Sequence, residues 1–374
     1  MHSPIAPSSA GIWGKPGGCT GWVLMTQLYP SESTPDSLAG DSAHELATKL
    51  IDNPDGDFIG QKSSNGLIYD DDMFKSAMIY AIDVIDLLNK IRKSAKPIIG
   101  IENKVRAPQI HKQSHGTIDC WIYNPMTKTL WIWDFKHGHD VVEVFENWQL
   151  INYTAGLIWK LKLRDTEIII VMRLVQPRAY HREGVIREWV VRGEQLRSYF
   201  NDLHYNAHIA LSNDAVTNPG KHCKNCSART NCKAALDTGT ALYTVATMPT
   251  PVELDNYQLS TQLAILTDAY DQIKALKKGY ETRIESLIAK GENIPGWLMH
   301  TTHGRLQWNH SYDDVVNMGD MFDVDLRKKE AITPTQASKT GIDKSVIMAY
   351  SKRSVTGHKL TQDDGAIASK VFNK

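Results

Sequence analysis

The arrangement of polar and apolar residues is clearest in two short segments on either side of a turn. Residues 116–119 and 131–136 alternate apolar with polar side chains, which is the pattern of β-strands that have one buried face. Residues 124–127, Asn-Pro-Met-Thr, favour a turn between them. The pattern therefore predicts a β-hairpin that ends near Lys136.

Charged residues at the end of this hairpin are the first candidates for chemistry. Residues two apart in a strand share a face, so Asp134 and Lys136 point the same way. A hairpin symmetrical about Met126 and Thr127 places Asp119 directly opposite Asp134. Two carboxylates and an ammonium group are costly among Ile and Trp unless they bind something, and a hard divalent cation with oxygen ligands is the natural guest. The alternative is an ordinary exposed salt bridge between strands.

The segments around the hairpin predict an α/β fold. Helices are expected over 40–52, 72–94 and around 193–211. Residues 166–175 form a mostly apolar run that is typical of a buried parallel strand, and 186–191 alternate as an edge strand does. We therefore expect a central mixed sheet flanked by helices.

The last third of the chain has a different pattern. Apolar residues recur at spacings of three and four over 252–290, which predicts a long amphipathic helix ended by Gly291. We interpret its apolar face as packing against the preceding domain rather than as a coiled-coil dimer. A short β-hairpin is expected over 295–308, and a small helix from Thr333-Pro334. This divides the chain into domains at 1–240 and 241–374.

Composition excludes some classes of function. The 374 residues include 42 Lys plus Arg and 42 Asp plus Glu, so the formal net charge is zero and gives no general argument for nucleic acid. Local basic clusters remain, one of them at Lys104, Arg106 and Lys112. No apolar run reaches the roughly 18 residues of a membrane span, and no secretory signal is visible. A membrane partner is therefore not expected.

The five cysteines suggest a metal site. Cys223-x2-Cys226-x5-Cys232 has a metal-ligand spacing, and Cys19 stands alone near the N-terminus. Cys120 neighbours Asp119 on its strand, points to the opposite face and is expected to be a buried small hydrophobe. Structural zinc accepts four thiolates, and His222 or His208 could replace Cys19 in such a site. Free thiols are a further alternative.

Several motifs together resemble the PD-(D/E)XK nuclease superfamily. Asp119 followed by Asp134-Phe135-Lys136 looks like its D…(D/E)xK core. Gln149 and Tyr153, one turn apart on a helix, resemble the QxxxY motif of the RecB-like branch. His44 and Glu102 stand where that branch has its metal-binding His and a further acid. The order of the five motifs resembles the family over residues 40–155, and the resemblance implies a restriction-endonuclease-like core.

The resemblance also implies cofactors and roles. It makes His44, Glu102, Asp119 and Asp134 ligands of Mg²⁺ or Mn²⁺, with Lys136 acting on the attacking water and Gln149 and Tyr153 orienting the scissile strand or Lys136. RecB-like nucleases with one early and three late cysteines hold a [4Fe–4S] cluster. By that resemblance the cluster's ligands are the following: Cys19, Cys223, Cys226 and Cys232.

The later segments extend the resemblance to a phage-encoded RecB-like exonuclease family. They are Cys223 onward, Pro295-Gly296-Trp297, Arg305-x2-Trp308 and 333–337. The expected function is a metal-dependent DNA exonuclease in phage recombination or DNA processing. Its expected partners are linear duplex or single-stranded DNA ends and a phage single-strand annealing protein, in the cytoplasm of the infected bacterial host. A structure-specific or nicking endonuclease and a catalytically silent nucleic-acid-binding module are the alternatives.

Overall fold

The chain forms two compact units in a computed structural model. The structure describes residues 3–31, 33–249, 253–308, 310–327, 332–337 and 342–362. The first unit is Met1–Tyr280 and the second is Glu281–Lys374. The boundary expected at residue 240 therefore lies inside the first unit.

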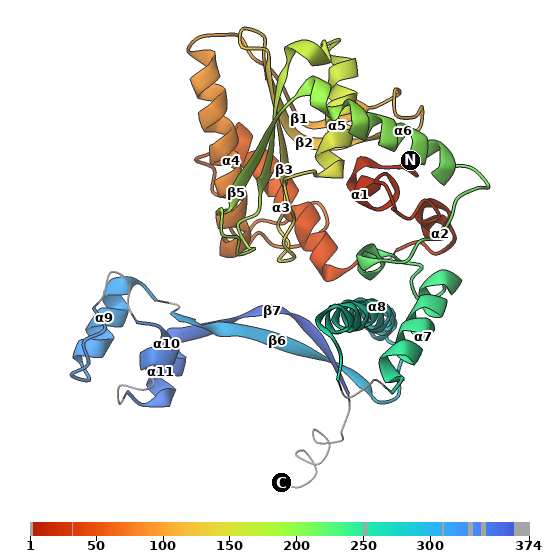
Figure 1. Cartoon of the computed structure of the whole chain (residues 1–374). Helices are drawn as coiled ribbons and strands as arrows, with labels where there is room; N and C mark the ends of the chain where they lie inside the picture. Colours follow the sequence, from red (N-terminus) through yellow and green to blue (C-terminus); the bar gives the residue numbers. More distant parts are fainter. Residues whose placement is uncertain are drawn as a thin grey trace. The chain divides into compact units, whose positions relative to one another are not determined.

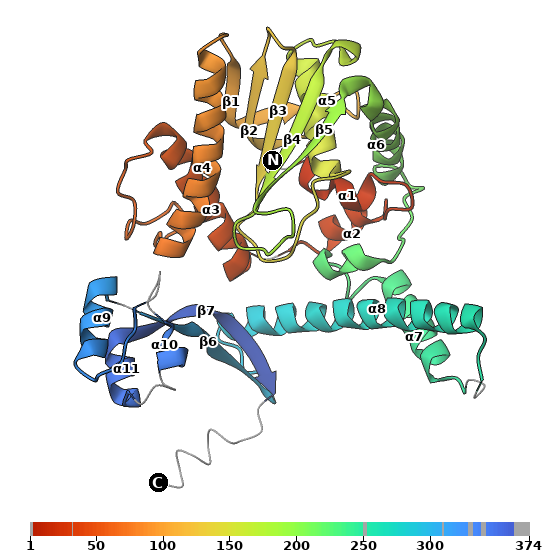
Figure 2. The ribbon, with the colours of Figure 1, turned by 60° about the vertical axis from the view of Figure 1, so that its left-hand side comes forward.

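A five-stranded sheet organises the first unit. Its strands lie side by side in chain order, and all neighbours are antiparallel except β3 and β4, which are parallel (Figures 1 and 2). The strands are β1 (Ile98–Arg106), β2 (His115–Asn124), β3 (Thr129–Phe135), β4 (Ile169–Val175) and β5 (Ile186–Arg192). The parallel pair requires a crossover, which α5 (Trp148–Lys160) supplies.

Helices cover both faces of this sheet (Figure 1). On one face, α3 (Pro35–Asp52) and α4 (Asp71–Arg92) bury a hydrophobic cluster with Cys120 and Phe135. On the other, α5 and α6 (Arg197–Ala210) pack with the N-terminal α1 (Ala10–Trp13) over Ile118 and Ile132. The predicted α/β class with a central mixed sheet is confirmed, and it is consistent with a restriction-endonuclease-like core.

The predicted hairpin has the expected register. Asn124 pairs with Thr129 and Cys120 with Trp133, which is the predicted register, and the regular pairing ends there, just before Asp119 and Asp134. Cys120 is fully buried, as predicted. The long strand predicted over 166–175 begins later, because residues 165–167 form a short 3-10 helix before β4.

The first unit ends with the cysteine segment and two helices. After α6, a short 3-10 turn (Lys221–Asn225) precedes α7 (Lys233–Thr247), and α8 (Asn256–Ala289) carries the chain on into the second unit. The predicted long helix is therefore present. However, several of its large apolar residues do not pack on the domain: Leu263 is 67% exposed and Tyr270 63% exposed. Three of its four buried residues are small, namely Ala269, Ala275 and Gly279, and the fourth is Gln272. Gly279 permits a close approach to Arg229.

The second unit is built on a two-stranded antiparallel sheet. β6 (Trp297–Trp308) pairs with β7 (Ser351–Gln362), and α9 (Tyr312–Asp320), α10 (Pro334–Ala337) and α11 (Lys344–Tyr350) lie between them in the chain. The hairpin predicted over 295–308 is wrong: this segment is one continuous strand with two register irregularities, and its partner comes some 50 residues later. The small helix predicted from Thr333-Pro334 is confirmed as α10. Throughout the described parts of both units, no helix is long and apolar enough to cross a bilayer.

Candidate functional site

Residues from α3 and three adjacent strands meet beside the sheet. His44 Nδ1 on α3 lies 3.3 Å from Asp119 Oδ1 on β2 and 3.8 Å from Glu102 Oε1 on β1. Potential ligand atoms of these three residues all lie within 4.8 Å of one another. Within the described part of the chain, no other group of three His, Cys, Asp or Glu residues is this close.

A local distortion of β1 places Glu102 in this group. Glu102 has φ 43°, which is uncommon for a residue other than glycine, and it interrupts the regular pairing of β1 with β2 between Ile101 and Asn103. Ile101 packs with the α3/α4 cluster, whereas Val105 of the same strand packs with the α5/α6 cluster. Odd-numbered residues of β1 therefore point to one face of the sheet before Glu102 and to the other face after it. Such outliers concentrate at functional sites.

Asp134, Lys136 and Gln149 form a second group. Lys136 Nζ lies 3.0 Å from Asp134 Oδ1 and 3.3 Å from Gln149 Oε1. The Gln149 amide donates to the same Asp134 oxygen at 2.7 Å. Gln149 occupies the first turn of α5, where the Asn147 side chain caps the helix by accepting from Leu150 N. The helix therefore holds the amide over the end of β3.

The other oxygen of Asp134 has no partner. Asp134 is 2% exposed, and its Oδ2 is buried without a hydrogen-bond partner in the structure. An ionised carboxylate with an unpaired buried oxygen is costly. Asp134 falls outside the group of three ligand atoms within 4.8 Å, although the charges of Asp119 and His44 act on its carboxyl group. The group itself offers two carboxylates and one imidazole, ligands that Mg²⁺ and Mn²⁺ accept. The donor chemistry therefore fits a divalent cation.

The electrostatics of the site follow from its crowded carboxylates. Burial by itself lowers the pKa of His44, but the Asp119 charge and hydrogen bonds to Asp119 and Glu102 raise that pKa to about 10. Burial raises the pKa of Asp134, and the Asp119 charge adds to this effect while Lys136 opposes it. Burial lowers the pKa of Lys136, yet Asp134 and Asp119 raise it overall. The carboxylates thus attract positive charge to this place.

Tyr153 lies near the two groups but its hydroxyl is already used. It donates to the Thr117 carbonyl oxygen of β2, and the ring is 6% exposed. Position 116 accommodates glycine but no larger residue without a shift, because an added Cβ would lie 3.0 Å from this hydroxyl and 2.9 Å from Pro7 Cδ. Tyr153 therefore positions the strand that carries Asp119.

Phe135 contributes to the site although sequence reasoning did not single it out. Its backbone N–H donates to Asp119 Oδ2 at 2.7 Å, and its ring centroid lies 5.3 Å from that of His44 and 5.1 Å from that of Tyr80, on which it stacks. Phe135 thereby fixes a carboxylate and an imidazole at once. The sequence feature that could have indicated this role is the position of Phe135 between Asp134 and Lys136, which makes its side chain point to the opposite face of the strand.

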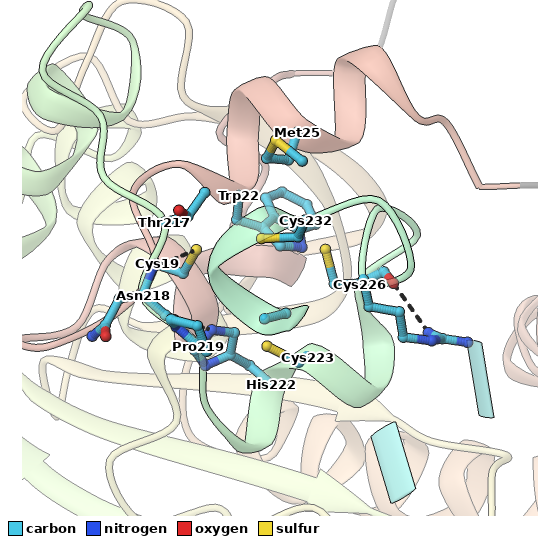
Figure 3. Close-up of a pocket in the computed structure, with 12 residues that line it drawn as sticks. Cys19, Trp22, Met25, Thr217, Asn218, Pro219, His222, Cys223, Cys226 and Cys232 are labelled. Atoms are coloured by element: carbon cyan, nitrogen blue, oxygen red, sulfur yellow. Dashed lines mark hydrogen bonds between the residues drawn. The ribbon is translucent and has the colours of Figure 1, made fainter. Parts of the chain in front are cut away.

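Four cysteines line a second site. Cys19, Cys223, Cys226 and Cys232 all border one pocket, and their thiols face a common space in Figure 3. Cys120 is not part of it, because it is buried under α3 and α4. Backbone N–H groups already point at two of the sulfurs: Asn218 N lies 3.4 Å from Cys19 Sγ, and Gly220 N lies 3.4 Å from Cys223 Sγ.

The histidines considered as alternative ligands differ in position. His222 also lines the pocket, but its Nε2 lies 2.9 Å from the Asn218 carbonyl oxygen. His208 belongs to another surface, where its ring contacts those of His204 and His111. Among the described residues, no three of the four sulfurs come within 4.8 Å of one another. Tetrahedral zinc with bonds of about 2.3 Å needs sulfurs only about 3.8 Å apart.

Comparison with known proteins identifies the family. Residues 2–355 match the family described as "Protein of unknown function (DUF2800)". Since the match spans most of the chain, the protein belongs to this family. No curated protein matches the chain.

Proposed function

We propose that the first unit is a Mg²⁺- or Mn²⁺-dependent deoxyribonuclease, acting as an exonuclease on DNA ends. The observation that carries this proposal is the unpartnered, buried Oδ2 of Asp134 beside the His44, Glu102 and Asp119 ligand group. The resemblance to the PD-(D/E)XK nucleases, RecB-like branch, supports it. So does the sheet, whose order places Asp119 and Asp134 on adjacent strands.

The residues divide the work of phosphodiester hydrolysis. A divalent cation held by His44, Glu102, Asp119 and Asp134 would supply a water of lowered pKa and offset charge on the phosphate. Lys136, 30% exposed and 3.0 Å from Asp134, is placed to position that water and to stabilise negative charge that develops on the phosphate. Gln149 holds Lys136 and Asp134 in one geometry through its two hydrogen bonds.

Exposed cations beside the site suit a nucleic-acid substrate. Lys104 and Arg106 are exposed on β1, the strand that carries Glu102. Side chains of this kind contact phosphates without regard to sequence. Linear duplex or single-stranded ends are the proposed substrate, a phage single-strand annealing protein the proposed partner, and the cytoplasm of an infected bacterial host the proposed compartment.

We also propose that Cys19, Cys223, Cys226 and Cys232 hold a [4Fe–4S] cluster. Four thiols around one pocket fit the usual ligand set. The cluster would tie residue 19 to the end of the first unit. Iron and acid-labile sulfide in a brown protein would support this assignment. Stoichiometric zinc in a colourless protein would show that the four cysteines bind zinc instead.

The nuclease proposal is tested with purified, anaerobically prepared protein and three labelled DNAs. Linear, nicked and covalently closed circular DNA are incubated with Mg²⁺, Mn²⁺ or EDTA. Degradation of linear DNA that EDTA stops, with closed circles spared, is the expected result. Rapid cutting of closed circles would support the endonuclease instead. DNA binding without cleavage under every condition would support the silent module. Asp134→Asn is expected to abolish this degradation. Asp71→Asn, which neutralises an exposed carboxylate of α4, is its control and should degrade linear DNA as the wild type does.

A further inference from the structure

Three histidines meet on a surface that belongs neither to the carboxylate site nor to the cysteine pocket. His204 and His208 lie four residues apart on α6, so they share one face of that helix. Their ring centroids are 4.4 Å apart, and the His208 ring meets the His111 ring edge-on at 4.9 Å. His111 comes from the turn over residues 107–114, which joins β1 to β2. Two separate elements of the first unit thus contribute to one group of imidazoles.

The spacing of these rings suits ligands of a shared metal ion. When two imidazoles bind one zinc ion through bonds of about 2.0 Å, at a right or tetrahedral angle, their centroids lie roughly 4.5–5 Å apart. The separations of 4.4 Å and 4.9 Å are close to this spacing. An ion beside His208 therefore lies within reach of all three rings.

Backbone carbonyls fix the two histidines of α6 in the tautomer that binds metals. His204 Nδ1 lies 3.0 Å from the Gln109 carbonyl oxygen, and His208 Nδ1 lies 2.8 Å from the carbonyl oxygen of His204. A carbonyl oxygen only accepts, so in each neutral ring Nδ1 carries the proton and Nε2 keeps its lone pair. Histidines that bind metals commonly donate their second N–H to a carbonyl in this way.

His111 needs a small rearrangement to join this pair. Its Nδ1 accepts a hydrogen bond from Gln113 N at 3.2 Å, so the neutral ring carries its proton on Nε2. The ligand atoms of the three histidines are not all within 4.8 Å of one another, so the His111 ring has to turn and give up this bond. The bond is exposed and spans only two residues, so water replaces it at little cost in free energy.

The elements that carry the three rings are otherwise held in place. Within the turn, Ser114 N donates to the His111 carbonyl oxygen. The Gln109 side-chain amide donates to the Ala155 carbonyl oxygen of α5. On α6, Leu203 is fully buried next to the exposed His204. Rigid supports of this kind reduce the conformational entropy that is lost when a ligand binds.

We propose that His111, His204 and His208 form a second metal site, which takes a transition-metal cation such as Zn²⁺ or Ni²⁺ rather than Mg²⁺. Imidazole nitrogens suit these ions, whereas Mg²⁺ prefers oxygen ligands. Three imidazoles leave the fourth position of a tetrahedral zinc ion to water. The bound ion ties the turn between β1 and β2 to α6. The site is independent of whether the carboxylates catalyse hydrolysis.

Isothermal titration of the full chain with Zn²⁺ tests the site. The protein is prepared anaerobically and its bound metal is determined first, so that metal already held by the cysteines is known. One further equivalent of zinc is expected to bind, and excess Mg²⁺ should not displace it. His208→Gln should raise the dissociation constant of this equivalent about tenfold or more, because His208 contacts both other rings. His111→Gln should raise it less, since His111 gives up a hydrogen bond to join.

Two control variants locate the bound zinc. His310→Gln, at an exposed histidine of the second unit, should bind zinc as the wild type does. Asp119→Ala should also keep this equivalent, because it alters only the carboxylate group. Zinc that is lost in Asp119→Ala but retained in His208→Gln would overturn the proposal, and so would the absence of a further equivalent in the wild type.

Hydrogen exchange gives a second readout that does not depend on affinity. Zinc should slow amide exchange within residues 107–114 of the wild type, because the ion ties this turn to α6. His208 is exposed, so circular dichroism should show that His208→Gln stays folded, and zinc should no longer protect the turn in this variant. Equal protection in both proteins would place the zinc elsewhere and overturn the site.

Discussion

The carboxylate site and the cysteine pocket both bring distant residues together, but they do so on different supports. His44, Glu102, Asp119 and Asp134 belong to a helix and three adjacent strands, whose backbone hydrogen bonds exist whether or not a cation binds. The four cysteines lie on loops, short turns and a helix start, and Cys19 is separated from Cys223 by about 200 residues of chain.

This difference indicates which interactions stabilise the geometry of each site. Around the carboxylates, the sheet supplies the geometry, and repulsion between the acids lowers stability. At the cysteines, hydrogen bonds such as Gly21 N to the Val216 carbonyl hold the segment of Cys19 against residues 216–218, and a bound group would add a link to residues 223–232. Loss of a ligand should therefore abolish chemistry at the first site and stability at the second. The predictions below test this contrast.

The largest effect is expected at Asp134. Asp134→Ala should lower cleavage of linear DNA by on the order of 10³-fold or more, because it removes a cation ligand and the partner of Lys136. The free energy of unfolding should change little, since a buried and partly unpartnered charge is removed. Cleavage assays and urea denaturation measure the two quantities. Asp119→Ala and Lys136→Ala should behave alike, and wild-type cleavage by Asp134→Ala would remove the nuclease from this site.

The second effect is expected at Cys19 and has the opposite character. Cys19→Ser should lower the free energy of unfolding by several kcal/mol and discharge the visible colour, because the N-terminal segment loses its tie to residues 223–232. Cleavage should fall only as far as the folded fraction falls. Cys120→Ala is the matched control, since Cys120 is buried elsewhere and its variant should keep the colour. Equal colour loss in both variants would contradict the four-ligand site.

The two sites also differ in how far the sequence predicted them. Alternation and the turn at 124–127 were sufficient to predict the register of β2 and β3, because a hairpin register depends on local residues. The positive φ of Glu102 could not be foreseen, because it depends on how the strand meets its neighbour rather than on the residue type.

Longer-range contacts were the less predictable part. The periodicity of α8 correctly predicted a helix, but periodicity does not tell which face a domain buries, and Gly279 and Ala275 decided this by permitting close packing. The sequence predicts a hairpin over 295–308 rather than the single strand β6, because the true partner of this strand, β7, lies far along the chain. Cys19 joined the pocket in a way that no local pattern around it indicated.

A smaller effect is expected from acid, and it should arise next to the carboxylate site rather than at the cysteines. His137 is 6% exposed; its Nδ1 lies 3.2 Å from Ser76 Oγ and its Nε2 2.8 Å from Arg178 Nη1. Burial and the Arg178 charge lower the pKa of His137 to about 4, although Asp72 and Asp70 oppose this. The neutral form is thus favoured on folding. Its contribution to stability is complete above pH ~6.5 and declines as pH falls toward 4.

Urea denaturation at a series of pH values measures this decline. In His137→Gln the amide keeps a neutral side chain between Ser76 and Arg178 and does not titrate, so the slope of stability against pH between 6.5 and 4 should become shallower. Met126→Gln, at an exposed residue of the turn between β2 and β3, is the control and should keep the wild-type slope. An unchanged slope in His137→Gln would show that other groups cause the acid sensitivity.

The smallest effect is expected at Tyr153, where the carboxylate site depends on its support. Tyr153→Phe removes the hydroxyl that donates to the Thr117 carbonyl but keeps the ring against β2. One lost hydrogen bond should cost about 1 kcal/mol of unfolding free energy, and cleavage should fall only severalfold, because Asp119 keeps its bond from Phe135 N. Gln149→Ala, which frees both Lys136 and Asp134, should lower cleavage more than Tyr153→Phe while changing stability less. The reverse order would mean that Tyr153 contacts the substrate directly and that the sheet alone does not position Asp119.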